Sequence, residues 1–223
     1  MVEQGIENPR VGGSIPSSAT IRLSGAGRAK MPPMQPNPRK TTSFRDLGEV
    51  DIDALRERVL AIPEAVWDAE NASKPNRFDA LSSTRHIVFR FIRSPESWTQ
   101  SYDRPIWTAF RDTVMPVVEQ AIAPYGYAEP AFPRIMLARM APGGVIHPHV
   151  DANPAARWPH KIHVPLTTHP QCTFLAGGEW RHLPAGRAVE VNNMQTHAVR
   201  NEGDVDRIHL IFELVDPDQP VVD

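Results

Sequence analysis

The chain has 223 residues, of which 41% are hydrophobic and 22% are charged, proportions typical of a globular protein and too apolar for wholesale disorder. This length suits one sizeable domain with tails. The formal net charge of -2 gives no electrostatic reason to expect nucleic acid or an anionic membrane surface as the main partner.

Cysteine occurs once, at Cys172, so the sequence allows no internal disulfide and no cysteine-based zinc site. No run of about 18 apolar residues occurs, and residues 1–30 lack the compact apolar segment of a secretory signal. We therefore expect a cytoplasmic protein that does not cross a membrane.

Residues 1–43 are rich in Gly, Pro and Ser and show no apolar periodicity, which predicts a disordered tail. The segment "NPRVGGSIPSSAT" within it resembles the conceptual translation of a transfer-RNA gene. We therefore expect the natural start at Met31 or Met34, and residues 44–223 are predicted to form a single domain.

Two segments near the start of this domain have apolar residues at helical spacing, residues 51–67 and residues 104–126. In the first, the apolar positions are Leu55, Val59, Leu60 and, past a proline, Val66. We expect both helices to cover one face of a sheet.

The remainder of the chain is predicted to form strands, which are short, apolar or alternating, and bounded by turn residues. At least six strands are expected, and the seven candidate segments are residues 84–92, 133–140, 160–166, 172–176, 179–183, 187–192 and 207–215. Helices followed by many short strands indicate a mainly β fold with flanking helices, either an antiparallel barrel or a sandwich.

The stretch "HPHVD" at residues 147–151 is a candidate metal site. Side chains at alternate positions of a strand share a face, so His147 with His149 would supply two imidazoles, whereas His149 with Asp151 would supply nitrogen and oxygen donors. We favour the second pair and expect His147 to lie at the entrance or behind the ligands.

A further ligand is expected from a later strand, and His197 in "NNMQTHAVRN" is the candidate. Arg207 begins the strand "RIHLIFELV", in which Ile208, Leu210 and the following alternate positions form the core face. Arg207, His209 and Ile211 then share the opposite face. A buried arginine there is costly unless it meets an anion.

Two histidines and one carboxylate on one face of iron(II) leave three positions open, as in non-haem iron oxygenases. A 2-oxo acid fills two of these positions and dioxygen the third. An arginine fork suits the remote carboxylate of that acid better than a lysine does.

With these motifs in "HPHVD", "HKIHVPL", "NNMQTHAVRN" and "RIHLIFEL", the sequence resembles the aspartyl/asparaginyl β-hydroxylase family, over about residues 134–215. The resemblance implies a double-stranded β-helix, a jelly-roll or cupin-like barrel. It also implies iron ligation by His149, Asp151 and His197, and binding of 2-oxoglutarate by Arg207.

In that family a basic residue two before a histidine also contacts 2-oxoglutarate, and Lys161 and His163 match these two positions. Lysine stands here in place of the commoner arginine. Some relatives lack the carboxylate at the position of Asp151, so its presence makes the chain similar to the branch that hydroxylates amino acids, including free proline.

The implied reaction decarboxylates 2-oxoglutarate to succinate and carbon dioxide and hydroxylates an unactivated C–H of an amino acid or of a peptide or protein side chain. Two alternatives stay open at this point. One is a cupin-like metal-binding barrel without oxygenase activity, a sensor or an isomerase, and the other is an inactive binding module of the same fold. The sequence does not predict the oligomeric state.

Other polar and aromatic residues have weaker assignments. His86, His160, His169 and His182 are expected to be exposed, and His209 to fill the barrel interior beside Arg207. Trp158 and Trp180 are candidates for substrate stacking at the mouth, although such rings more often simply pack. For Asn192 and Asn193, a turn or a hydrogen bond behind the metal ligands and a contact with substrate are equal alternatives.

Overall fold

The computed structural model describes residue 40 and residues 42–218, and these residues belong to one compact unit. The predicted disordered tail, residues 1–43, lies outside the described residues apart from Lys40, Thr42 and Ser43. The alternative starts at Met31 and Met34 also lie outside them. The extent of the domain, 44–223, stays a prediction. No helix among the described residues is both long enough and apolar enough to cross a membrane.

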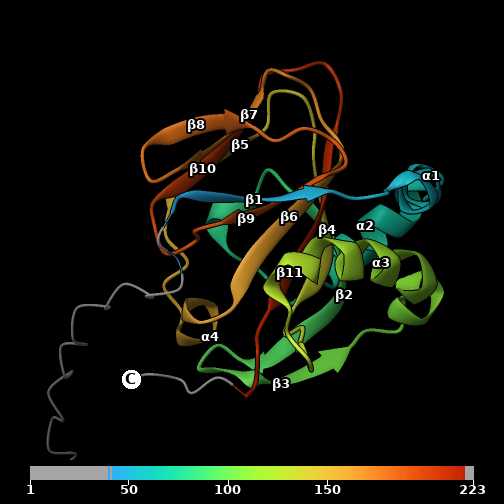
Figure 1. The fold of residues 1–223 in the computed structure, drawn as a ribbon. Helices are drawn as coiled ribbons and strands as arrows, with labels where there is room; N and C mark the ends of the chain where they lie inside the picture. Colours follow the sequence, from blue (N-terminus) through green and yellow to red (C-terminus); the bar gives the residue numbers. More distant parts are fainter. Residues whose placement is uncertain (1–39, 41, 219–223) are drawn as a thin grey trace, which may run out of the picture. The chain divides into compact units, whose positions relative to one another are not determined.

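Six helical segments and eleven strands make up the described chain (Figure 1). The helical segments are α1 (Asp53–Leu60), α2 (Glu64–Ala72), η1 (Asp79–Leu81), α3 (Trp107–Ile122), η2 (Ala123–Tyr125) and α4 (Pro154–Arg157). The strands are β1 (Phe44–Glu49), β2 (Arg85–Ser94), β3 (Ser97–Asp103), β4 (Ile135–Met140), β5 (Val145–His149), β6 (His160–Thr167), β7 (Cys172–Ala176), β8 (Glu179–His182), β9 (Arg187–Val191), β10 (His197–Asn201) and β11 (Arg207–Leu214).

The strands form two antiparallel sheets. The larger has seven strands in the order β1-β9-β6-β11-β4-β2-β3, and the smaller has four in the order β5-β10-β7-β8. Each sheet interleaves strands from distant parts of the chain, so segments far apart in sequence lie side by side (Figure 1). The prediction of a mainly β fold with flanking helices is confirmed.

The helices α1, α2 and α3 cover one face of the seven-stranded sheet (Figure 1). Leu55 and Val59 of α1, Trp67 of α2 and Val114 of α3 are at most 2% exposed and join one core cluster with the apolar face of β11. Leu60 was predicted to share the apolar face of α1, but it is 58% exposed. It is the last residue of α1, and the chain turns at Pro63 into a separate helix.

The inner face of the seven-stranded sheet is turned toward the four-stranded sheet. A second core cluster joins Met140 and Val189 of the larger sheet to Ile146, Phe174 and Val199 of the smaller one. Between the sheets lies a cavity of about 390 Å³, lined by side chains of both.

Strand β11 contributes to both layers because its side chains alternate. Ile208, Leu210, Phe212 and Leu214 pack in the cluster beneath the helices, as predicted. Arg207 and Ile211 face the cavity, and so does Glu213 at the next alternate position. The period-2 pattern of one strand therefore supplies both the core and the cavity wall.

Candidate metal centre

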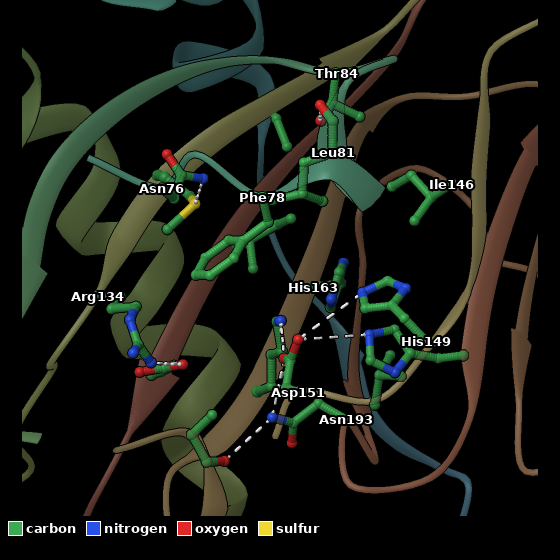
Figure 2. A pocket seen from close by; sticks show the side chains of 18 of the residues that line it. Asn76, Phe78, Leu81, Thr84, Arg134, Ile146, His149, Asp151, His163 and Asn193 are labelled. Atoms are coloured by element: carbon green, nitrogen blue, oxygen red, sulfur yellow. Dashed lines mark hydrogen bonds and ion pairs between the residues drawn. The ribbon is translucent and has the colours of Figure 1, made fainter. Parts of the chain in front are cut away.

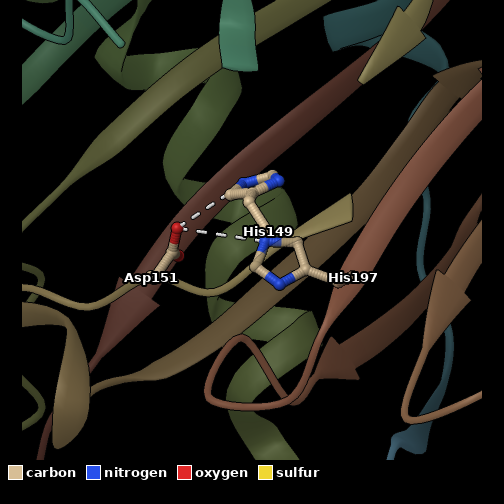
Figure 3. Close-up of side chains that lie close together, drawn as sticks. All are labelled: His149, Asp151 and His197. Atoms are coloured by element: carbon tan, nitrogen blue, oxygen red, sulfur yellow. Dashed lines mark ion pairs between the residues drawn. The ribbon is translucent and has the colours of Figure 1, made fainter. Parts of the chain in front are cut away.

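His149, Asp151 and His197 meet at the wall of the cavity (Figure 3). His149 ends β5, Asp151 follows two residues later, and His197 begins β10 directly opposite His149 in the antiparallel pairing. One potential ligand atom of each residue lies within 4.8 Å of those of the other two.

Both imidazoles turn Nε2 toward the carboxylate. His149 Nε2 and His197 Nε2 each lie 3.9 Å from Asp151 Oδ1, and the ring centroids are 4.2 Å apart. On the far side of each ring, Nδ1 lies close to a backbone carbonyl oxygen. His149 Nδ1 is 2.9 Å from the carbonyl oxygen of His147, and His197 Nδ1 is 3.0 Å from that of Gln195. An Nδ1–H that donates to these carbonyls leaves the Nε2 lone pair free for a metal.

The electrostatics of these groups also suit a cation. Burial lowers the pKa of His197 to about 4, so its ring is neutral at neutral pH, as a metal ligand must be. Burial alone would raise the pKa of the Asp151 carboxyl, but the Lys161 ammonium beside it holds that pKa well below its ordinary value. Two imidazoles and one carboxylate therefore fit a divalent transition metal.

The second oxygen of Asp151 is held by two side chains. Lys161 Nζ lies 2.5 Å from Asp151 Oδ2, and Asn193 Nδ2 donates to the same oxygen over 3.1 Å. Asn193 Oδ1 in turn accepts a hydrogen bond from Lys40 Nζ. Asn193 therefore makes a hydrogen bond behind a candidate metal ligand, one of the roles expected from the sequence. The contact of Lys40 with Asn193 was not expected, because no motif surrounds Lys40.

His147 is exposed and lies outside the cluster of His149, Asp151 and His197. Of the two pairs that the sequence allows, the structure therefore brings together His149 with Asp151 and not His147 with His149. Lys161 lines the cavity, although its ammonium is turned toward Asp151. Its predicted contact with 2-oxoglutarate stays a prediction.

Arg207 and His163 line the same cavity. Arg207 is 1% exposed, and its Nη2 donates to His209 Nδ1 over 2.8 Å, as expected from their common face. Within residues 40 and 42–218, no carboxylate pairs with Arg207, and neither its Nε nor His163 Nε2 has a hydrogen-bond partner. Burial lowers the pKa of Arg207 to about 10, so it remains charged and requires an anion.

The rest of the cavity wall differs from the prediction (Figure 2). Its phenylalanine side chains are Phe78, Phe91, Phe174 and Phe212, whereas Trp158 and Trp180 are not part of it. The Trp180 ring lies 41% exposed beneath the Arg200 guanidinium, 4.7 Å from the ring centroid. The loop carrying Phe78 gave no periodic signal, so the sequence offered no way to place it.

Two histidines expected on the surface are buried. His160 is 4% exposed because Glu190 Oε1 lies 2.6 Å from its Nδ1 and the Tyr127 hydroxyl 2.9 Å from its Nε2. His86 is 2% exposed and reaches the cavity wall, with Lys74 Nζ 3.1 Å from its Nδ1. The prediction for these two was wrong because neighbours distant in sequence satisfy their polar atoms. His169 and His182 are half-buried.

Comparison with solved structures supports the fold. An oxidoreductase of the 2OG-Fe(II) oxygenase family from Burkholderia pseudomallei superposes with a TM-score of 0.53 at 14% identity, covering 79% of this chain and 86% of the other. AviO1 from Streptomyces viridochromogenes gives 0.52 at 15% identity, over 81% and 93%. The collagen prolyl hydroxylase of Paramecium bursaria Chlorella virus 1, solved with 2OG, gives 0.50 at 10% identity, over 80% and 98%.

No curated protein matches the sequence. The family model of aspartyl/asparaginyl beta-hydroxylases matches residues 70–217, which is more than half of the chain. The predicted double-stranded β-helix and the predicted class of enzyme, an iron(II)- and 2-oxoglutarate-dependent hydroxylase, are thereby confirmed. The chain belongs to the aspartyl/asparaginyl β-hydroxylase family.

Proposed function

We propose that this enzyme hydroxylates an unactivated C–H of an amino acid or of an amino-acid side chain, with His149, Asp151 and His197 holding the iron(II). The observation that supports this most is their convergence: two imidazole nitrogens and one carboxylate oxygen meet within 4.8 Å at the cavity wall. Bound there, iron(II) supplies the open coordination positions at which dioxygen and a 2-oxo acid react.

The overall reaction consumes one substrate, one 2-oxoglutarate and one dioxygen. One oxygen atom enters the substrate as a hydroxyl group, and the other enters the carboxylate of succinate as carbon dioxide leaves. The two electrons lost by the C–H bond and the two lost in the decarboxylation together reduce dioxygen. No further reductant is needed.

Arg207 and His163 are proposed to bind 2-oxoglutarate. The Arg207 guanidinium is buried in the cavity without a carboxylate partner among the described residues, and the remote carboxylate of 2-oxoglutarate supplies the missing anion. His163 Nε2 lies unpaired in the same cavity and offers a second polar contact. A metal sensor or an isomerase would have no use for this buried cation, which argues against a cupin-like barrel without oxygenase activity.

Lys161 is proposed to orient Asp151. Its ammonium and the Asn193 amide hold Oδ2, which leaves Oδ1 directed toward His149 and His197. A carboxylate fixed in this way is ready to bind metal through one oxygen without rearranging. The enzyme's side chains therefore position groups and exclude water, and they perform little acid or base chemistry.

The test is single-turnover incubation with iron(II), 2-oxoglutarate and isotopically labelled dioxygen, with a panel of amino acids and short peptides. We expect one labelled oxygen in succinate and one in the hydroxylated product. Succinate that forms without label, or at the same rate without iron(II), would contradict the proposed reaction. In the same assay His149→Ala, which removes a proposed iron ligand, should form neither labelled product. His147→Ala is its matched control and should form both.

A further inference from the structure

A second polar group lines the cavity and takes no part in the proposed binding of iron or 2-oxoglutarate. Arg134 Nη1 lies 2.5 Å from Glu213 Oε1, with the two side chains 10% and 5% exposed. The Glu213 backbone N–H donates to the Arg134 carbonyl over 2.9 Å, so Arg134, which directly precedes β4, lies next to Glu213 on β11. Figure 2 shows Arg134 across the pocket from His149.

This ion pair leaves one carboxylate oxygen without a partner. Glu213 Oε2 is buried and accepts no hydrogen bond from any described residue. Asn76, which is 4% exposed, repeats the pattern: its Nδ2 faces Met136 Sδ at 3.8 Å, and its Oδ1 has no partner within the described chain. Asn76, Met136, Arg134 and Glu213 all line the cavity, so both unpaired acceptors belong to its wall.

The position of Glu213 separates it from the 2-oxoglutarate group. Arg207 and Glu213 lie on one face of the same strand, six residues or about 20 Å apart. Glu213 pairs in register with Lys161, whose ammonium contacts Asp151. The carboxylate is therefore held with Arg134 at the end of the cavity away from Arg207 and across the pocket from His149.

We propose that Glu213 and Asn76 bind a protonated amine of the substrate. This inference rests on the proposed function, because it names the substrate group that the same cavity takes. An ammonium carries only donors, and it satisfies both unpaired acceptors. A hydrogen bond between two charged groups is also stronger than one from a neutral donor.

Arg134 has a different part in this arrangement. It occupies Oε1 and fixes the direction of the carboxyl group. Arg134 is therefore a positioning residue, and Glu213 is the residue that touches substrate. Since the reactive C–H must lie at the metal, the substrate spans the pocket between Glu213 and the candidate metal centre.

The experiment compares free L-amino acids with their Nα-acetyl counterparts as substrates of the iron(II)-loaded enzyme, measured by succinate release and by mass spectrometry of the product. We expect turnover of the amines and at least about 10-fold lower kcat/KM for the acetylated compounds. Glu213→Gln keeps an oxygen for Arg134 but turns an amide N–H₂ toward the substrate. It should lower kcat/KM for the amine by about 10- to 100-fold. Glu179→Gln, an exposed carboxylate on β8, is the control and should change nothing.

Equal turnover of acetylated and free amines, full activity of Glu213→Gln, or no turnover of any amine would overturn the inference. Asn76→Leu provides a second variant if Glu213→Gln does not fold, and it too should lower kcat/KM for the amine. The charge-transfer absorption of the anaerobic complex with iron(II) and 2-oxoglutarate distinguishes failure of the proposed function from failure of this inference. Its absence contradicts the proposed function, whereas its presence without amine selectivity contradicts only this inference.

Discussion

Lys161 Nζ lies 2.5 Å from Asp151 Oδ2, so the cation expected at 2-oxoglutarate is directed at a candidate iron ligand. The Lys161 side chain is 23% exposed and that of Asp151 is 20% exposed, and the pair is therefore shielded from much of the screening by solvent. A lysine can act in this way because a point charge is sufficient to orient one carboxylate oxygen.

Replacing this lysine separates its two possible roles. Lys161→Met retains most of the side-chain length and removes the charge, so we expect iron(II) affinity to fall by about 10- to 100-fold, as when a supporting contact to a ligand is lost. Anaerobic iron(II) titration measures this fall. A higher KM for 2-oxoglutarate with unchanged iron(II) affinity would show that Lys161 contacts the co-substrate instead.

Arg207 is predicted to determine 2-oxoglutarate affinity without affecting iron. Arg207→Met removes the guanidinium that lacks a carboxylate partner in the described chain, and the KM for 2-oxoglutarate should rise by at least about 10-fold. Without 2-oxoglutarate the same variant should be more stable to heat than the parent protein, because an uncompensated buried cation is gone. Arg200→Met, at an exposed position of β10, is the matched control and should alter neither quantity. An unchanged KM in Arg207→Met would contradict the assigned role.

The buried carboxyl group of Glu190 predicts a loss of stability in acid. Burial alone would raise its pKa, but hydrogen bonds with His160 and Tyr125 outweigh this effect and hold the pKa below the ordinary value. A carboxyl group with a lowered pKa contributes stability above its unfolded pKa and loses it as the pH falls through the folded one. The free energy of unfolding should therefore fall below about pH 4.5. Urea titrations at several pH values should show that the free energy of unfolding of Glu190→Gln falls less steeply in acid than that of the parent protein. Equal pH dependence in the two proteins would refute the assignment.

Much of the fold follows from periodicity in the sequence. The alternation of "RIHLIFEL" predicts both faces of β11, with Leu210 in the core and Arg207 in the cavity, and the structure has both. Strand β1 was missed because "FRDLGE" alternates poorly and contains Gly48. Its partner β9 lies more than 130 residues later, and Phe44 pairs with Val191, so only the tertiary fold reveals this strand.

The same limit applies to the site. The residue types in "HPHVD" and their spacing predict the ligands, but not which oxygen of Asp151 faces them. That depends on Lys161 and Asn193, which reach the carboxylate from a neighbouring strand and a loop. Glu213 was accessible to the period-2 argument, since it continues the face of Arg207, whereas Asn76 lies in a loop without any pattern.

The central claim is that His149, Asp151 and His197 bind iron(II) together. The most direct measurement is visible absorption of the anaerobic protein with iron(II) and 2-oxoglutarate, in the parent protein and in His149→Ala, His197→Ala and His147→Ala. We predict a metal-to-ligand charge-transfer band in the parent and in His147→Ala, and its loss in the other two variants. A band of full intensity in His149→Ala and His197→Ala would contradict the account.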